Sequence, residues 1–141
     1  MVVRVKIRVK ARRSGKSKEI IVLANGGAES PRPCIVVEPR TAEELGLWPP
    51  EEAEVYRVEE ASTISRVFLL RKAVTLELLS EEGSVLSSVE ADLVIQEGLT
   101  EPIITDITID ELGIQVISFS RGLWRHKEDK PETIRRSPTK S

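Results

Sequence analysis

The residues with the clearest chemical potential in this 141-residue chain are Asn25 and Gly26. An asparagine followed by glycine is prone to cyclise to a succinimide and hydrolyse to aspartate, because glycine has no side chain to hinder attack by its backbone nitrogen. Without that reaction, the Asn25 amide donates and accepts hydrogen bonds but cannot take up or deliver a proton at ordinary pH. Asn-Gly is also the strongest short signal for a hairpin turn, so a simple turn is the alternative interpretation.

Few other side chains suggest chemistry. Asp106 and Asp110 are four residues apart, so they share one face of a predicted helix and could act as acids, although Asp106 also suits the first turn of that helix. His126 has no cysteine or histidine partners at metal-ligand spacing, so we expect it to be exposed and expect no metal site and no cofactor. Cys34 precedes the apolar run Ile35-Val36-Val37 and is predicted to be a buried small hydrophobic residue.

The elements that must position these residues are mostly strands. Alternating or continuous apolar runs predict strands over residues 2–11, 19–24, 34–38, 53–58, 66–79, 85–96 and 114–119. The sequence Thr41-Ala42-Glu43-Glu44 has the form of a capping box and predicts a short helix that ends near Gly46. A second short helix is expected to follow Thr105 and to stop at Gly113. The fold class is therefore all-β with two short helices.

Charge is distributed unevenly along the chain. Eight lysines and arginines and no acids precede Glu19, whereas residues 19–120 carry six basic and twenty acidic side chains. The basic side chains of the first strand could contact nucleic-acid phosphates. Their alternation with apolar residues is also the ordinary pattern of a half-buried strand with a solvated face. Such a face could instead pair with the chain's own acidic body or with that of a partner subunit.

The amino-acid composition indicates the environment in which the protein works. One asparagine and two glutamines against 44 charged side chains are typical of proteins that work at high temperature. No stretch approaches the roughly 18 apolar residues of a membrane span, and the alternating start of the chain does not form a signal peptide. The single cysteine fits a reducing compartment. These features predict a cytoplasmic protein with no membrane partner.

Several motifs, in their order along the chain, resemble those of retropepsin-like aspartic proteases. In that family a strand leads into Asp-Thr-Gly-Ala-(Asp/Glu), and residues Asn25 to Glu29 occupy the same five places. The resemblance covers most of residues 2–125, and Thr105 stands where glycine is usual. The further motifs are Ile35-Val36-Val37, Leu45-Gly46-Leu47, Ile103-Ile104-Thr105-Asp106, Leu112-Gly113-Ile114 and Arg121-Gly122-Leu123-Trp124-Arg125. The last of them is similar to the ending of archaeal members of the family.

The resemblance implies a closed β-barrel of the acid-protease type over residues 1–125, with a flap hairpin at roughly residues 56–68. Residues 126–141 are polar and lack an apolar period, so they are predicted to form a disordered tail. Family members of this size are half-enzymes, in which two protomers each contribute one aspartate to a shared dyad. The resemblance therefore also implies a homodimer with residue 25 near its two-fold axis.

The chain departs from the family where the chemistry occurs. Asn25 replaces the aspartate that serves as general acid and base, and Gly26 replaces a threonine that braces the loop. The favoured function is thus a catalytically inactive pseudoprotease that binds extended peptide. Ala28 and Glu29 occupy the places where the family binds substrate ends, although Glu29 could equally form a salt bridge with Arg32.

Two other functions stay open from the sequence. An active aspartic peptidase would need an acid regenerated by deamidation of Asn25, or supplied by another carboxylate such as Asp106. A nucleic-acid binder would use the basic N-terminal strand and would show strong salt dependence.

Overall fold

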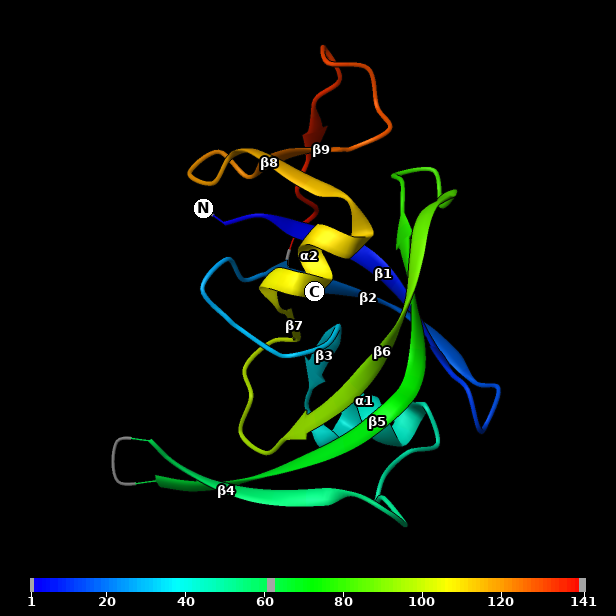
Figure 1. Cartoon of the computed structure of the whole chain (residues 1–141), viewed down its shortest axis with the longest axis vertical. Coiled ribbons are helices and arrows are strands. Elements are labelled where there is room, and N and C mark those ends of the chain that lie inside the picture. The colour runs from blue at the N-terminus through cyan, green and yellow to red at the C-terminus, as the bar shows by residue number, and fades with distance from the viewer. Residues whose placement is uncertain (1, 61–62, 140–141) are drawn as a thin grey trace.

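The computed structural model describes residues 2–60 and 63–139. The structure is mostly β (Figure 1), as the sequence predicts. Strands make up 49% of the chain, and the described residues form two short helices. The helices are α1 (Pro39–Glu44) and α2 (Asp106–Leu112). The strands are β1 (Arg4–Ala11), β2 (Ser17–Ala24), β3 (Cys34–Val37), β4 (Glu54–Glu60), β5 (Thr63–Leu79), β6 (Val85–Gln96), β7 (Ile103–Ile104), β8 (Ile114–Ser118), β9 (Leu123–His126) and β10 (Arg135–Arg136).

Six strands of the larger sheet form a ring. The strand order is β1-β2-β7-β3-β6-β5-β4, and a further pairing of β1 with β5 closes the ring and leaves β4 outside it. Alternate residues in β1 and just before it face the core, because Val3, Val5, Ile7 and Val9 are fully buried. The core inside the ring therefore comes from the alternate, inward-facing residues of its strands.

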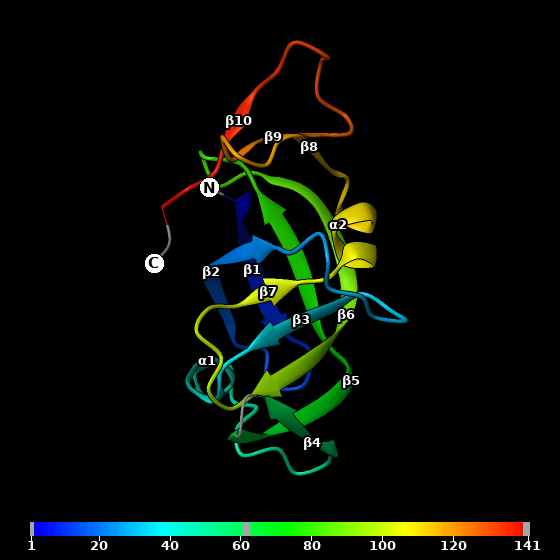
Figure 2. The same ribbon diagram turned by 90° about the vertical axis from the view of Figure 1, so that its left-hand side faces the viewer.

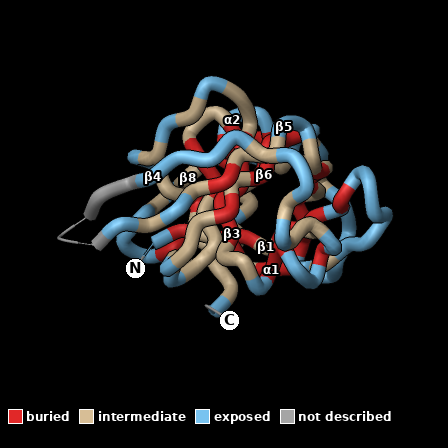
Figure 3. The backbone as a smooth tube through the Cα atoms, turned by 90° about the horizontal axis from the view of Figure 1, so that it is seen from below, coloured by how far each residue is buried: buried red, intermediate tan, exposed pale blue. Residues whose placement is uncertain are grey.

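A hairpin made of β4 and the first part of β5 extends from the ring. Its two strands pair in register from Glu54 opposite Leu69 to Glu60 opposite Thr63. Residues 54–57, 64 and 66 of this hairpin are exposed, and Figure 3 shows β4 lying away from the buried centre. The flap predicted over residues 56–68 falls on this hairpin, and residues 61 and 62 of that segment lie outside the described residues.

The two helices differ in how well their ends were predicted. The helix α2 has Thr105 at its N-cap position and Gly113, with φ of 77°, at its C-cap, which confirms the sequence prediction. The helix α1 begins at Pro39, so the predicted capping box at Thr41 is wrong. Thr41 lies inside the helix and donates its hydroxyl hydrogen bond back to the Glu38 carboxylate. A proline at the first helical position set the start of α1 instead.

The last residues also differ from the predicted disordered tail. The strands β8, β9 and β10 form a second sheet, in which Arg135 lies opposite Trp124 (Figure 2). Ser137 accepts a hydrogen bond from the Arg4 backbone N–H (2.9 Å) and donates one to the Gly122 carbonyl (2.7 Å). His126 is 2% exposed and not solvated as predicted. These contacts join segments far apart in the sequence, which explains why local composition missed them.

Candidate functional site

The loop that contains Asn25 is held between two elements. The Asn25 backbone N–H donates to the Ile104 carbonyl (3.2 Å) in β7, and the Asp106 N–H at the start of α2 donates to the Ala28 carbonyl (2.8 Å). Within the loop, the Ala28 N–H donates to the Asn25 carbonyl (3.1 Å), and the Gly27 N–H donates to Asn25 Oδ1 (3.3 Å). Asn25 therefore shapes the loop as an asparagine that starts a turn and bonds the backbone two residues on.

Strand pairing excludes a simple hairpin at Asn25-Gly26. The strands before and after the loop, β2 and β3, do not pair with each other, because β7 lies between them (Figure 2). β7 pairs parallel to β2 and antiparallel to β3. The loop therefore connects two strands that β7 separates in the sheet, so it is not a two-residue hairpin turn.

The tip of this loop is exposed beside an aromatic ring. Gly26 and Gly27 are exposed, and Phe119, which follows β8, is 53% exposed. A Cβ atom placed on Gly26 would lie 3.5 Å from Phe119 Cζ, so the ring sits directly over the glycine. A large apolar side chain and a glycine-rich turn therefore share one surface at residue 25, which is the composition expected of a contact surface.

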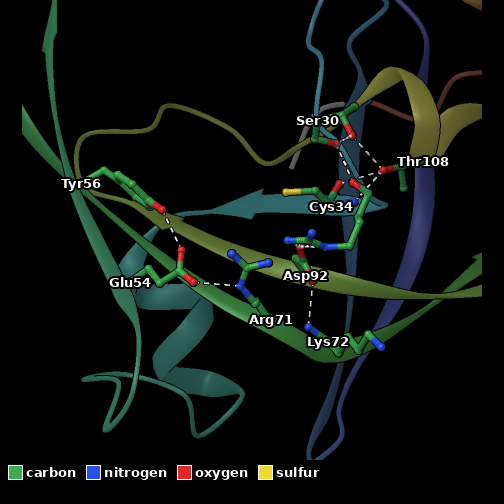
Figure 4. A network of polar contacts seen from close by, with 10 residues as sticks. Ser30, Cys34, Glu54, Tyr56, Arg71, Lys72, Asp92 and Thr108 are labelled. Carbon is green, nitrogen blue, oxygen red and sulfur yellow. Dashed lines mark hydrogen bonds and ion pairs between the residues drawn. The ribbon is translucent and has the colours of Figure 1, made fainter.

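A chain of hydrogen-bonded hydroxyl groups links the end of the Asn25 loop to α2. Ser30 Oγ and Thr105 Oγ1 share a hydrogen bond of 2.7 Å, and Thr105 Oγ1 and Thr108 Oγ1 share one of 2.9 Å. Thr108 Oγ1 also accepts from the Cys34 N–H (2.7 Å) at the start of β3 (Figure 4). Thr105 and Thr108 are buried, so these bonds form away from water and rigidify the loop. Sequence reasoning did not identify Ser30 or Thr108, because single hydroxyl residues carry no recognisable spacing.

Cys34 behaves as predicted. It is 5% exposed, and its burial, aided by the negative charge of Asp92, raises the pKa of its thiol to about 12. A thiol with such a pKa stays protonated and is not a nucleophile.

A continuous row of residues crosses the outer face of the sheet beside the loop. In-register pairs link Leu23 to Ile103, Ile103 to Val36, Val36 to Val94, and Val94 to Leu69. Residues paired in this way have their side chains on the same face of a sheet. The row starts two residues before Asn25 and ends at Leu69, next to Glu54 on the hairpin. We call Leu23, Ile103, Val36, Val94 and Leu69 the outer apolar row.

Four of these five side chains are half-buried, and Val36 is 8% exposed. They lie on the face opposite to the closed core, where alternate residues such as Val22, Ile35 and Leu93 are fully buried. The strands in this region are therefore apolar on both faces. The chain therefore covers this second apolar face only in part.

A polar cluster lies beside the outer apolar row, since Glu54 pairs with Leu69 and Asp92 lies two residues before Val94. Figure 4 labels four members of this cluster, Glu54, Tyr56, Arg71 and Asp92. We define it as Arg32, Glu54, Tyr56, Arg71 and Asp92. Glu54 accepts hydrogen bonds from Arg71 Nε (2.8 Å) and from the Tyr56 hydroxyl (2.7 Å), and these bonds hold the pKa of its carboxyl below the ordinary value. The bond to Glu54 raises the pKa of Tyr56 in turn. Glu54 is therefore an ionised acceptor and not a proton donor.

Asp92 is the buried member of the polar cluster, with its side chain 6% exposed. Its Oδ2 accepts from Arg32 Nε (3.1 Å), and its Oδ1 accepts from the backbone N–H of Lys72 (2.8 Å). Lys72 has φ of 49° and lies where the register between β5 and β6 shifts. Asp92 thus stabilises an irregular strand, and its two oxygens are occupied by structural bonds.

The other predicted site residues occupy varied positions. Glu29 is exposed, and the expected Glu29–Arg32 salt bridge does not form, because Arg32 pairs with Asp92. Asp106 lies in the first turn of α2, where a carboxylate is favoured, and its backbone joins it to the Asn25 loop. Asp110 is exposed. The structure therefore brings Asn25, Ala28 and Asp106 together and leaves Glu29 and Asp110 at the surface.

The basic N-terminal strand is largely neutralised by the chain itself. Arg4 pairs with Glu101, Arg8 with Glu19 and Glu77, and Arg12 with Glu90. Lys10 also pairs with Glu77, and Lys18 with Glu44. The acidic body thus supplies the partners of these side chains, which is one of the alternatives that the sequence left open.

Within residues 2–60 and 63–139, no group of three or more histidine, cysteine, aspartate or glutamate side chains is placed to hold a metal ion. No helix in these ranges is long and apolar enough to span a membrane. Comparison with models of known protein families finds none that matches the chain, and a search of curated proteins finds no similar sequence.

Proposed function

We propose that this chain is a closed β-barrel of the acid-protease type that forms a homodimer through its Asn25 loops and binds extended peptides without cleaving them. The outer apolar row is the observation that carries the proposal. It runs from the Asn25 loop to the base of the β4–β5 hairpin and is only partly covered. An extended peptide could lie along it and contact alternate side chains.

The dimer follows from the loop surface. Gly26, Gly27 and the Phe119 ring are exposed together at the end of the outer apolar row. Two copies that meet at this surface would join their rows into one groove across the two-fold axis. Burial of two Phe119 rings would contribute the apolar area that the association requires.

Asn25 determines that the dimer binds and does not cleave. Peptide hydrolysis by an aspartic site needs a carboxylate that accepts a proton from water and an acid that donates one. An amide does neither, and its Oδ1 already accepts the Gly27 N–H. The site can therefore hold a peptide backbone through hydrogen bonds but has no proton to transfer.

A direct test combines binding and turnover. Pools of apolar eight-residue peptides should bind the protein saturably, and mass spectrometry should find every peptide intact after prolonged incubation. A Val94→Lys variant places a charge within the row and should weaken binding at least tenfold, since a charge on an apolar contact surface is costly to desolvate. Ser88→Lys, on the same strand away from the row, is the matched control. Cleaved products, or equal binding by Val94→Lys and wild type, would overturn the proposal.

One observation favours an active aspartic peptidase as the second candidate. The hydrogen bond from the Asp106 N–H to the Ala28 carbonyl brings an acid next to the Asn25 loop. Deamidation of Asn25 would supply another carboxylate. This candidate predicts cleavage that increases with heating, together with a mass gain of about one dalton, and that disappears in Asp106→Asn or Asn25→Ala. Heated protein with unchanged mass and no cleavage would eliminate it.

A further inference from the structure

Two of the few basic side chains of an otherwise acidic body belong to the polar cluster. Residues 19–120 contain six basic side chains against twenty acidic ones. Two of the six, Arg32 and Arg71, lie in the polar cluster next to the outer apolar row. Among the described residues, the carboxylates that they bond are Asp92 and Glu54. The charges of these four groups balance, so the cluster offers a ligand its free N–H donors and not an excess of charge.

Both arginines have unused hydrogen-bond donors. Among the described residues, the Arg71 guanidinium donates a hydrogen bond only through Nε, to Glu54, which leaves its two terminal nitrogens without an acceptor. Arg32 contacts Asp92 through Nε and Nη2, and its Nη1 has no acceptor in the part of the chain that the structure describes. The side chains of Arg71 and Arg32 are 53% and 38% exposed. A ligand can therefore reach the free edges of both groups.

Arg71 lies beside the end of the outer apolar row. Glu54, which holds Arg71, lies directly opposite Leu69, the last residue of the row. Glu54 also fixes the guanidinium through Nε, so its terminal nitrogens are oriented before a ligand arrives. Two parallel N–H groups of arginine match the two oxygens of a carboxylate in geometry and charge.

We infer that the ligands of this groove are extended peptides in which apolar residues are accompanied by one acidic side chain, whose carboxylate Arg71 binds with help from Arg32. The inference rests on the proposed peptide-binding function and adds the class of peptide. The carboxylate accepts hydrogen bonds from the free guanidinium N–H groups and fixes the register of the peptide along the row.

Positional peptide pools test the inference. Each pool is eight residues long, acetylated and amidated, and has Glu or Gln at one fixed position with an equal mixture of Ala, Val, Ile, Leu and Phe elsewhere. Binding is measured by competition in fluorescence anisotropy. At one or two positions, we expect the Glu pool to bind the wild type about tenfold more tightly than the Gln pool, because a charged hydrogen bond replaces a neutral one.

Two variants locate the effect. Arg71→Gln should reduce the Glu-to-Gln ratio to about one. Arg66→Gln is the matched control, because Arg66 is an exposed arginine on the same strand that pairs with Glu97, and it should keep the ratio. Thermal unfolding of each variant should coincide with that of the wild type, which excludes a loss of fold.

The outcomes distinguish a failure of peptide binding from a failure of acid selection. If no pool binds, the proposed peptide-binding function fails and the inference fails with it. If the Glu and Gln pools bind equally at every position, peptide binding stands and acid selection is overturned. If the ratio persists in Arg71→Gln, or is lost in Arg66→Gln, the assignment to Arg71 is overturned.

Discussion

Asp92, beside the candidate site, and Asp129, in the segment between β9 and β10, both make structural hydrogen bonds. Asp92 satisfies a backbone N–H at a residue with positive φ and an arginine that extends from the loop. Asp129 accepts two bonds from Arg135 and one from the His126 N–H. Asp92 joins segments that lie far apart in the sequence, whereas Asp129 holds the local segment from His126 to Arg135, and each carboxylate should be costly to remove.

The first prediction concerns Asp92. Asp92→Asn keeps the shape of the side chain but loses its charge, so the bond to Arg32 weakens and the NH₂ group meets donors. We expect a loss of about 2 kcal/mol in the free energy of unfolding, measured with urea. Glu97→Gln breaks an exposed pair with Arg66 and should cost less than about 0.5 kcal/mol. Equal effects of the two substitutions would show that Asp92 does not stabilise the bulge in β5.

The second prediction concerns pH. The hydrogen bonds from Arg135 are the largest cause that lowers the pKa of Asp129 from 3.8 to about 2. Because the folded-state pKa is lower than the unfolded one, the stability from this group is complete above pH 4 and is lost as the pH falls toward 2. Asp129→Asn should therefore be less stable than the wild type at pH 6, and the difference should shrink between pH 4 and 2. A difference that is constant over this range would contradict the ion pair.

At the scale of elements, the sequence predicts the long strands well and misses the two-residue strands. The strand expected over 85–96 is β6 with the same bounds, because twelve residues give a clear pattern. β7 and β10 have two residues each, too few for any periodicity, and they exist only because neighbouring strands supply hydrogen bonds. The polar tail was predicted to be disordered for the same reason, since its contacts to Trp124, Gly122 and Arg4 are all non-local.

The third prediction tests whether β10 belongs to the folded unit. A chain that ends at residue 129 loses the strand that pairs with β9, the Arg135 guanidinium that lies 5.7 Å from the centre of the Trp124 ring, and the Ser137 bonds. Trp124, which is 4% exposed in the full chain, should become solvated. We expect a red shift of tryptophan emission, measured in a Trp48→Phe background, and a Tm lower by several degrees. Unchanged emission would show that the predicted tail contributes nothing to this sheet.

At the scale of the whole molecule, the candidate site combines features that the sequence shows with features that it hides. Asn25, its glycines and Asp106 were identifiable, because their residue types are chemically distinctive. The outer apolar row was not, because Leu23, Val36 and Ile103 look like ordinary strand residues until the register places them on one face. Arg71 and Arg32 gave no signal either, since their proximity depends on the irregular register of β5. The proposed function rests on this assembled face, and the proposed dimer adds a second copy of it.

The most direct test of the central claim is disulfide trapping across the proposed two-fold axis. Asn25→Cys is made in a Cys34→Ala background, and Glu82→Cys, at an exposed turn, measures random collisions. Under mild oxidation, the account predicts that Asn25→Cys converts rapidly to a covalent dimer of two 15.7 kDa chains, and that apolar peptide slows the reaction or changes its extent. If Asn25→Cys forms no more dimer than Glu82→Cys, the Asn25 loops do not face each other and the account of a shared peptide groove is wrong.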